Sequence, residues 1–201
     1  DCMGYYLLKD GVFLGETEPV SGTPTAFASQ SSSYGPEKAM DGDESTRWYY
    51  YSTSSTMGWW QMDLPLKRYI ASININWQYN PEGFEILAWQ NNNWIQIAEV
   101  KDNLQEINEI SFNKAYKTDK IRVNILKPYT SGNNKYFGIK EINIEAQKLI
   151  TGLTYQDNLL KAKQYQYSLT AENSVACESD PVQLTVTVNP PEQPTDVSLE
   201  V

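Results

Sequence analysis

The sequence predicts an all-β protein built from short antiparallel strands. Apolar residues alternate with polar ones in four runs, from Ile73 to Trp77, Phe84 to Ala88, Ile121 to Ile125 and Tyr165 to Ala171. Turn-forming clusters such as NPEG, NNN and TSGNN separate the runs, and helix signals are weak throughout. Short strands joined by polar loops are typical of β-sandwiches. The 201 residues are enough for one large β domain or two small ones.

Composition excludes several classes of function. The chain contains no histidine, which removes Ser-His-Asp and Cys-His catalysis and leaves zinc with two cysteines and some carboxylates. Its net charge of -9 repels phosphates, so we expect no nucleic-acid partner. No apolar run approaches the roughly 18–20 residues that span a bilayer, so we expect no membrane insertion. A carboxylate pair of the glycosidase type is the remaining catalytic candidate, and since no pattern singles out one pair, we predict no catalytic residue.

A series of strand motifs runs through residues 20–148. It begins with AMDGDESTRW from Ala39 to Trp48 and continues with WWQMDL from Trp59 to Leu64. The segments NNWIQI, IRVNIL and GIKEINIEA follow in that order. This order resembles the discoidin, or factor V/VIII type C, family, which includes the family 32 carbohydrate-binding modules. The resemblance implies that residues 20–148 form a discoidin-like jelly-roll β-sandwich of eight strands with no long helix.

The loop that follows Ala39 carries carboxylates and hydroxyls around a glycine. A hard cation such as calcium takes six or more oxygen ligands at about 2.3–2.6 Å, and Gly42 tolerates the positive φ that turns carbonyls inward. The resemblance implies a structural calcium that ties this loop to the last strand. Its predicted ligands are side-chain oxygens of Asp41, Thr46 and Glu141 and carbonyl oxygens of Lys38, Asp43, Thr46 and Lys140. The alternative is a solvated turn in which Asp41 caps local amides.

Aromatic and amide residues gather in three expected loops, YYYSTSSTMG, QYNPEG and KPYTSGNNKYFG. Aromatic faces stack on the C–H face of a pyranose while amides bond its hydroxyls, and such sites lie on loops of a rigid scaffold. The resemblance therefore implies a carbohydrate ligand. The predicted ligand-binding residues are Tyr49, Tyr51, Tyr79, Asn80, Tyr129, Asn134 and Tyr136. Tyr49 stands where galactose-binding relatives commonly carry a histidine, so the galactose geometry should not carry over unchanged. Four tryptophans in strand patterns are predicted to be core residues: Trp48, Trp60, Trp77 and Trp94.

The flanking segments resemble parts of a fibronectin type III domain. GYYLLKDGVFLGETE predicts a hairpin with its turn at Asp10 and Gly11, similar to strands C and C′ of that family. Near the other end, Leu159 and then Tyr165, with alternating residues after it, match the family's later strands. We predict that residues 1–19 and 149–189 form a partial fibronectin-like sandwich into which the middle domain is inserted. An unrelated hairpin that caps the middle domain is the alternative.

The same resemblance bears on the two cysteines. In the fibronectin fold the start of strand C lies near the loop between strands F and G, which would place Cys2 beside Cys177. A disulfide between them would fit an oxidising compartment. Residues 190–201 resemble a linker and the first strand of a following domain.

Together these observations predict a non-catalytic carbohydrate-binding module. We expect it to belong to a larger secreted or cell-surface bacterial glycan-processing protein and to neighbour that protein's catalytic domain. Its expected location is extracellular, cell-surface or periplasmic, with calcium as its only cofactor. A structural spacer or protein-interaction module is the alternative. A lipid-binding discoidin domain is disfavoured because the loops carry Ser, Asn and Tyr and the net charge opposes anionic lipid.

Overall fold

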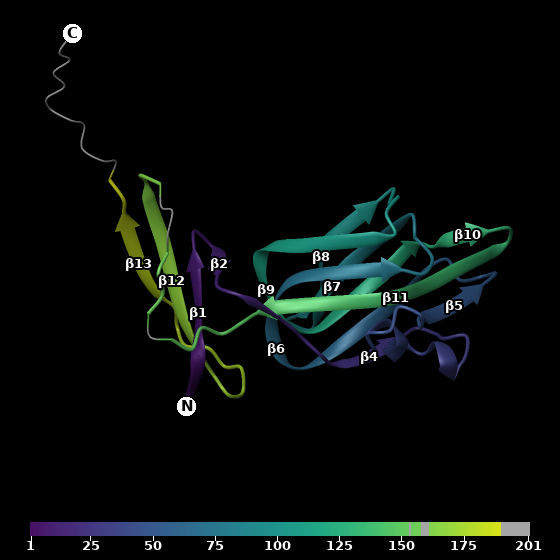
Figure 1. The fold of residues 1–201 in the computed structure, drawn as a ribbon, viewed down its shortest axis with the longest axis horizontal. Coiled ribbons are helices and arrows are strands. Elements are labelled where there is room, and N and C mark those ends of the chain that lie inside the picture. The colour runs from purple at the N-terminus through teal and green to yellow at the C-terminus, as the bar shows by residue number, and fades with distance from the viewer. Residues whose placement is uncertain (153, 158–160, 190–201) are drawn as a thin grey trace, which may run out of the picture. The chain divides into compact units, whose positions relative to one another are not determined.

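A computed structural model describes residues 1–152, 154–157 and 161–189 (Figure 1). The chain divides into two compact units: residues 15–148 form one, here called the sandwich, and residues 1–14 with those from 149 onward form the other, here called the small unit. The sandwich therefore lies, in sequence, between the two parts of the small unit. In the described part of the chain, no helix is long and apolar enough to cross a bilayer.

The sandwich is built almost entirely from antiparallel strands. Its elements are β3 (Thr17–Pro19), β4 (Thr23–Ala26), η1 (Ser32–Tyr34), η2 (Pro36–Ala39), β5 (Trp48–Ser52), β6 (Gly58–Trp77), β7 (Gly83–Gln90), β8 (Asn93–Lys101), β9 (Ile107–Lys127), β10 (Tyr129–Ser131) and β11 (Asn134–Gln147). The elements η1 and η2 are single turns of 3-10 helix. These described residues form nine strands where eight were expected, and they contain no long helix, as predicted.

Two long strands, β6 and β9, contribute to both layers. The first half of β6 pairs with β4 and with the second half of β9, which in turn pairs with β7. The second half of β6 pairs with β11 and with the first half of β9. The β6–β9 register is irregular between Asp63 and Arg68 and again between Ile70 and Ser72, where the pair passes from one layer to the other. The predicted all-β sandwich is confirmed.

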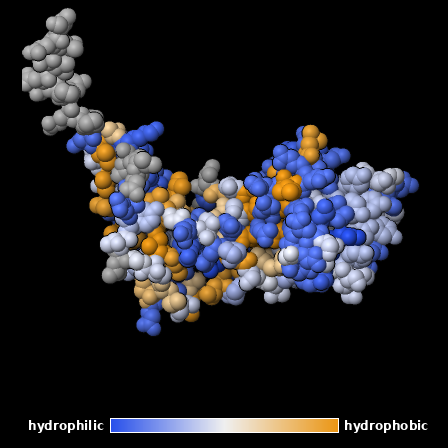
Figure 2. All heavy atoms as spheres, viewed as in Figure 1, coloured by the Kyte–Doolittle hydropathy of each residue, from blue (hydrophilic) through white to orange (hydrophobic). Residues whose placement is uncertain are grey.

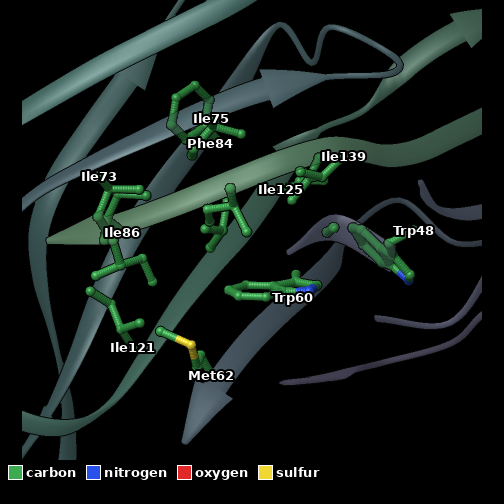
Figure 3. Close-up of a cluster of buried hydrophobic side chains, with 14 of the residues drawn as sticks. Trp48, Trp60, Met62, Ile73, Ile75, Phe84, Ile86, Ile121, Ile125 and Ile139 are labelled. Carbon is green, nitrogen blue, oxygen red and sulfur yellow. The ribbon is translucent and has the colours of Figure 1, made fainter. Parts of the chain in front are cut away.

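The core lies between these layers and includes the alternating residues that the sequence pattern selected (Figure 3). Trp48 and Trp60 are fully buried and Trp77 is 2% exposed. The indole of Trp48 donates to the carbonyl of Ala28 over 2.9 Å, so its polar atom is satisfied. Buried apolar residues from three of the predicted runs also belong to the cluster: Ile73, Ile75, Phe84, Ile86, Ile121, Val123 and Ile125.

Trp94 is not a core residue, contrary to the sequence prediction. It lies directly opposite Trp89 in the β7–β8 pair, and since Ala88 beside Trp89 is buried, both indoles face outward. The guanidinium of Arg122 stacks between Trp94 and Trp59, with its Cζ 4.3 and 4.4 Å from the two ring centroids. Trp94 therefore covers the outer face of the sheet.

The small unit is a four-stranded antiparallel sheet in the order β13-β12-β1-β2. Its strands are β1 (Cys2–Lys9), β2 (Val12–Leu14), β12 (Gln164–Asn173) and β13 (Val182–Thr187). The predicted hairpin turn is present, with Asp10 at φ 51° and Gly11 at φ 81°. The first segment thus pairs with the later one. However, the first part ends at Leu14, because β3 pairs with β11 of the sandwich instead.

One face of the small unit carries exposed apolar side chains. Leu169, Val182 and Leu184 are 38%, 68% and 59% exposed, and with Leu7 they line a hollow of about 370 Å³. Figure 2 shows hydrophobic side chains on the surface over β13. Of the alternating apolar residues Tyr165, Tyr167, Leu169 and Ala171, only Tyr165 is buried. The likeness to a fibronectin domain stays a prediction: Leu159 and residues 190–201 lie outside the described residues.

The disulfide expected between Cys2 and Cys177 is not formed, because both residues are free thiols. The β1–β12 register does bring Cys2 opposite Asn173, whose amide donates to the carbonyl of Cys177 over 3.0 Å. The thiol of Cys2 instead faces the carbonyl of Gly4, 3.4 Å away. The two residues therefore lie near each other without a bond.

We expect a thiol titration of the folded, unreduced protein to detect two reactive thiols per chain, because both cysteines are exposed. Denaturing the protein without reductant should not change that number. Two thiols that appear only after reduction would instead support the disulfide.

Candidate functional site

Three tyrosines stand side by side on neighbouring strands at one end of the sandwich. Tyr136 of β11 is directly opposite Tyr51 of β5 on one side and Tyr129 of β10 on the other. Directly opposed residues on adjacent strands point to the same face of a sheet. Tyr51 and Tyr129 are 42% and 43% exposed. The register therefore creates an aromatic row from residues that lie far apart in sequence.

Two further tyrosines extend this row. Tyr49 lies two residues before Tyr51 and so on the same face, opposite Gly138. A Cβ at Gly138 would lie 3.1 Å from the ring of Tyr79, so the glycine leaves room for that ring to pack down on β11. The ring centroid of Tyr79 is 5.5 Å from that of Tyr49 and 4.9 Å from that of Tyr136. All five predicted tyrosines are thus brought together, and we call them the tyrosine cluster.

The two predicted asparagines differ in their placement. Asn134 donates to the hydroxyl of Tyr136 over 3.4 Å and so belongs to the cluster. Asn80 follows Tyr79, but its side-chain oxygen accepts a hydrogen bond of 2.6 Å from the amide of Asn103. Asn103 is buried and also bonds the carbonyl of Pro81. Asn80 is therefore engaged in shaping its own loop.

Sequence reasoning missed two residues at the edge of the cluster. The ring of Tyr34, from η1, lies edge-on to Tyr49 with centroids 5.4 Å apart. The guanidinium of Arg47 lies over both rings, its Cζ 5.1 Å from the centroid of Tyr34 and 6.0 Å from that of Tyr49. Arg47 was visible as the neighbour of Trp48, but no local pattern connects it with the short helical turn that carries Tyr34.

The tyrosine cluster presents aromatic ring faces and uncharged phenol hydroxyls to a ligand. Burial, together with the neighbouring phenols of Tyr79, Tyr136 and Tyr51, raises the pKa of Tyr49 to about 12. Its hydroxyl is therefore protonated at neutral pH and can both donate and accept. Figure 2 shows the surface over β5 and β10 in pale colours of middling hydropathy, as aromatic phenols give. Such a surface can stack on an apolar ring face and bond hydroxyl groups.

The Asp41 loop lies beside the start of β5 and is organised around Thr46. The hydroxyl of Thr46 is 2.9 Å from both carboxylate oxygens of Asp41, 3.1 Å from the carbonyl of Asp43 and 3.3 Å from the carbonyl of Lys38. Gly42 has φ 78°, the positive value expected at this turn. Four of the six predicted metal-binding residues therefore converge on one point.

Glu141 closes this loop from β11, as predicted. Its Oε1 accepts a hydrogen bond of 2.9 Å from the amide of Gly42, 99 residues away in sequence. The β6–β11 register is irregular between Ile139 and Glu141, which sets Lys140 at a bulge in the ladder. No cluster of three His, Cys, Asp or Glu side chains that could hold a metal is found among the described residues, so a cation here would depend on carbonyl oxygens.

The pKa values of the two carboxylates of this site are shifted in opposite directions. Burial raises the pKa of Glu141, and the nearby charge of Asp41 adds to that effect. Burial would also raise the pKa of Asp41, but hydrogen bonds from Thr46 and the amide of Asp43, with the ammonium of Lys38, lower it below its ordinary value. Glu141 is only 7% exposed, and the ammonium of Lys38 contacts Asp41.

The family of this chain follows from its sequence. The sequence profile of the F5/8 type C domain matches residues 24–142, more than half of the chain. The chain belongs to the F5/8 type C domain family. The predicted discoidin resemblance is thus confirmed for the sandwich, and the match does not extend to the small unit. The chain matches no curated protein sequence.

Several solved structures similar to the chain are carbohydrate-binding modules. The family 32 module of C. perfringens NanJ, in complex with galactose, is 20% identical with a TM-score of 0.55, and the match covers 65% of this chain and 99% of that one. Chitosan-binding module 1 of a chitosanase/glucanase from Paenibacillus sp. IK-5 is 18% identical with a TM-score of 0.54, covering 62% and 95%. The family 32 module of Streptococcus pneumoniae EndoD is 14% identical with a TM-score of 0.53, covering 63% and 98%. At these identities the similarity establishes the fold.

Proposed function

We propose that the sandwich is a non-catalytic carbohydrate-binding module whose sugar site is the tyrosine cluster. The observation that carries the proposal is the convergence of Tyr49, Tyr51, Tyr79, Tyr129 and Tyr136 on one face, with two of them strongly exposed. A protein that needed these rings only for its own packing would bury them. Monomeric proteins seldom leave aromatic surface open without a partner for it.

The proposal agrees with what similar modules are described as binding. One of the structural neighbours was solved with galactose and another is a chitosan-binding module. We further propose that the chain is part of a secreted or surface protein that processes glycans, outside the cytoplasm, with a catalytic domain elsewhere in the same protein. The small unit is then a structural spacer.

The proposal includes a structural calcium at the Asp41 loop. Its ligands would be side-chain oxygens of Asp41, Thr46 and Glu141 with the carbonyl oxygens of Lys38, Asp43, Thr46 and Lys140. The support is that oxygens of Lys38, Asp41 and Asp43 already lie around Thr46. In addition, the nearly buried Glu141 of β11 stands beside a second carboxylate. A bound cation would supply the positive charge that two neighbouring carboxylates need. The cation holds the loop and takes no part in chemistry.

Sugar binding is tested by titrating galactose, N-acetylglucosamine, mannose and their oligosaccharides by calorimetry. A shallow site that buries one sugar is expected to bind with a millimolar Kd, about -4 kcal/mol. Tyr129→Ala should weaken binding at least severalfold, because it removes an exposed stacking face while leaving the core untouched. Tyr49→Ala should abolish it, since Tyr49 contacts Tyr34, Tyr51 and Tyr79.

Tyr155→Ala is the matched control, because Tyr155 is 45% exposed in the small unit, much as Tyr129 is in the sandwich. It should leave affinity unchanged. Binding that survives both cluster substitutions would place the site elsewhere, and no binding to any sugar would leave the chain as a spacer or protein-interaction module.

A further inference from the structure

Arg47 is the only one of the three arginines without a polar partner in the described part of the chain. Its Nε is buried and has no hydrogen-bond partner, and none of its other nitrogens contacts an acceptor of a described residue. Arg68 pairs with Glu18 and bonds the carbonyl of Gln147. Arg122 donates to the side-chain oxygen of Gln61 from both Nε and Nη2, over 3.0 and 2.7 Å.

The comparison with Arg122 matters because both guanidiniums are stacked on aromatic rings. Stacking uses the faces of the guanidinium and leaves its five N–H donors in the plane, where they need acceptors. Arg122 has such an acceptor in Gln61, so its stack is complete within the protein. Arg47 has the rings of Tyr34 and Tyr49 but lacks the acceptor.

The missing acceptor is unexpected from the charge of the chain. The protein carries 25 acidic side chains against 16 basic ones, so a carboxylate for Arg47 would have been easy to provide. Instead Glu44, the nearest carboxylate in sequence, is exposed and forms no ion pair with Arg47. The next two are engaged elsewhere, Asp43 with Ser45 and Asp41 with Lys38 and Thr46. Arg47 is left as a cation beside the tyrosine cluster.

We propose that Arg47 binds a carboxylate of the sugar ligand, so that the cluster recognises a uronate-containing oligosaccharide. This rests on the proposed function and names the class of its ligand. A guanidinium fork matches a carboxylate in shape and charge, and such charge-assisted pairs are the strongest hydrogen bonds available at a surface. The partner that the protein does not supply is therefore supplied by the ligand.

The arrangement of the rings fits a ligand of more than one sugar. Tyr34, Tyr49, Tyr79 and Tyr129 follow one another with centroid separations of 5.4, 5.5 and 5.8 Å. The row therefore extends well past a single ring, and Arg47 lies at its Tyr34 end. One uronate at that end would place its carboxylate at the guanidinium while its neighbours along the oligosaccharide lie over the remaining rings.

The experiment compares each uronate oligosaccharide with its own carboxyl-reduced form. Trisaccharides of galacturonate, glucuronate and mannuronate, and the matching neutral trisaccharides, are titrated against the full chain by calorimetry. At least one uronate should bind about tenfold more tightly than its neutral partner. Arg47→Gln should bring the ratio of uronate affinity to neutral affinity to about one, and added salt should reduce that ratio in the wild type.

Arg122→Gln is the matched control, since it removes the same charge from a stacked arginine on a different face of the sheet and should preserve the difference. Thermal melts verify that both variants fold. Equal affinity for a uronate and its reduced form would overturn the inference but not the proposed function, as would a difference that survives Arg47→Gln. Failure of every sugar to bind would overturn both.

Discussion

Replacing Trp60 with alanine is expected to lower the free energy of unfolding of the sandwich by about 3–5 kcal/mol. The indole is fully buried in the core, so its loss creates a cavity that close-packed neighbours fill only in part. Its Nε1 also donates to the carbonyl of Pro36 over 2.9 Å, and that carbonyl would lose its partner. Urea denaturation followed by near-UV circular dichroism measures the change.

Trp94→Ala is the control for this effect. It removes the same side chain from the outer face, where solvent already reaches it, and should cost less than half as much. The loss there is mainly the stacking against Arg122 and Trp89. Equal destabilisation by the two substitutions would show that burial does not decide which tryptophans hold the sandwich together.

Calcium is expected to produce the second largest change in stability. A ligand that binds only the folded state adds RT ln(1 + [L]/Kd), which is about 2.7 kcal/mol at a concentration one hundred times Kd. Chelation should therefore lower the melting temperature measurably, and calcium, not an equal ionic strength of sodium, should restore it. Differential scanning calorimetry with and without chelator makes the comparison.

The Glu141→Gln variant tests whether a change of melting temperature on chelation comes from a cation at this site. Glutamine keeps an oxygen that can accept the hydrogen bond from Gly42, but it removes the buried charge beside Asp41. Without calcium the variant should be at least as stable as the wild type, and calcium should no longer stabilise it. Asp63→Asn, a partly exposed carboxylate paired with Lys120, should respond to calcium normally. A melting temperature indifferent to chelation would remove the calcium proposal.

The alternation of apolar residues predicted most of the core, but it could not decide every tryptophan. A period of two tells which residues share a face and is silent on which face is inside. Trp48 and Trp60 are buried because they face the interior between the two layers. In β8, which pairs only with β7, the same pattern leaves Trp94 outside. The choice depends on the pairing of strands, which is a property of the whole domain.

The sequence predicted which tyrosines belong to the candidate site, but not how the fold arranges them. The five tyrosines were expected on loops, whereas Tyr51, Tyr129 and Tyr136 stand on adjacent strands whose register aligns them. Arg47 and Tyr34 were missed because their contact with Tyr49 is tertiary and leaves no periodic signal. The boundary of the first segment was placed too late for a similar reason. The pairing of β3 with β11 joins residues that are more than a hundred positions apart.

The chain enters and leaves the sandwich at one place. Thr17 of β3 is paired with Gln147 of β11, and the amide of Lys148 donates to the carbonyl of Glu16 over 3.0 Å. Tyr136 stands eleven residues back along β11, roughly 36 Å away for an extended strand. A glycan held at the tyrosine cluster and a tether at the exits would therefore pull on opposite ends of β11. Since ladder hydrogen bonds run across the strands, such tension loads many of them in shear at once. The strand pairs of β11 would therefore oppose unfolding of the sandwich under such tension.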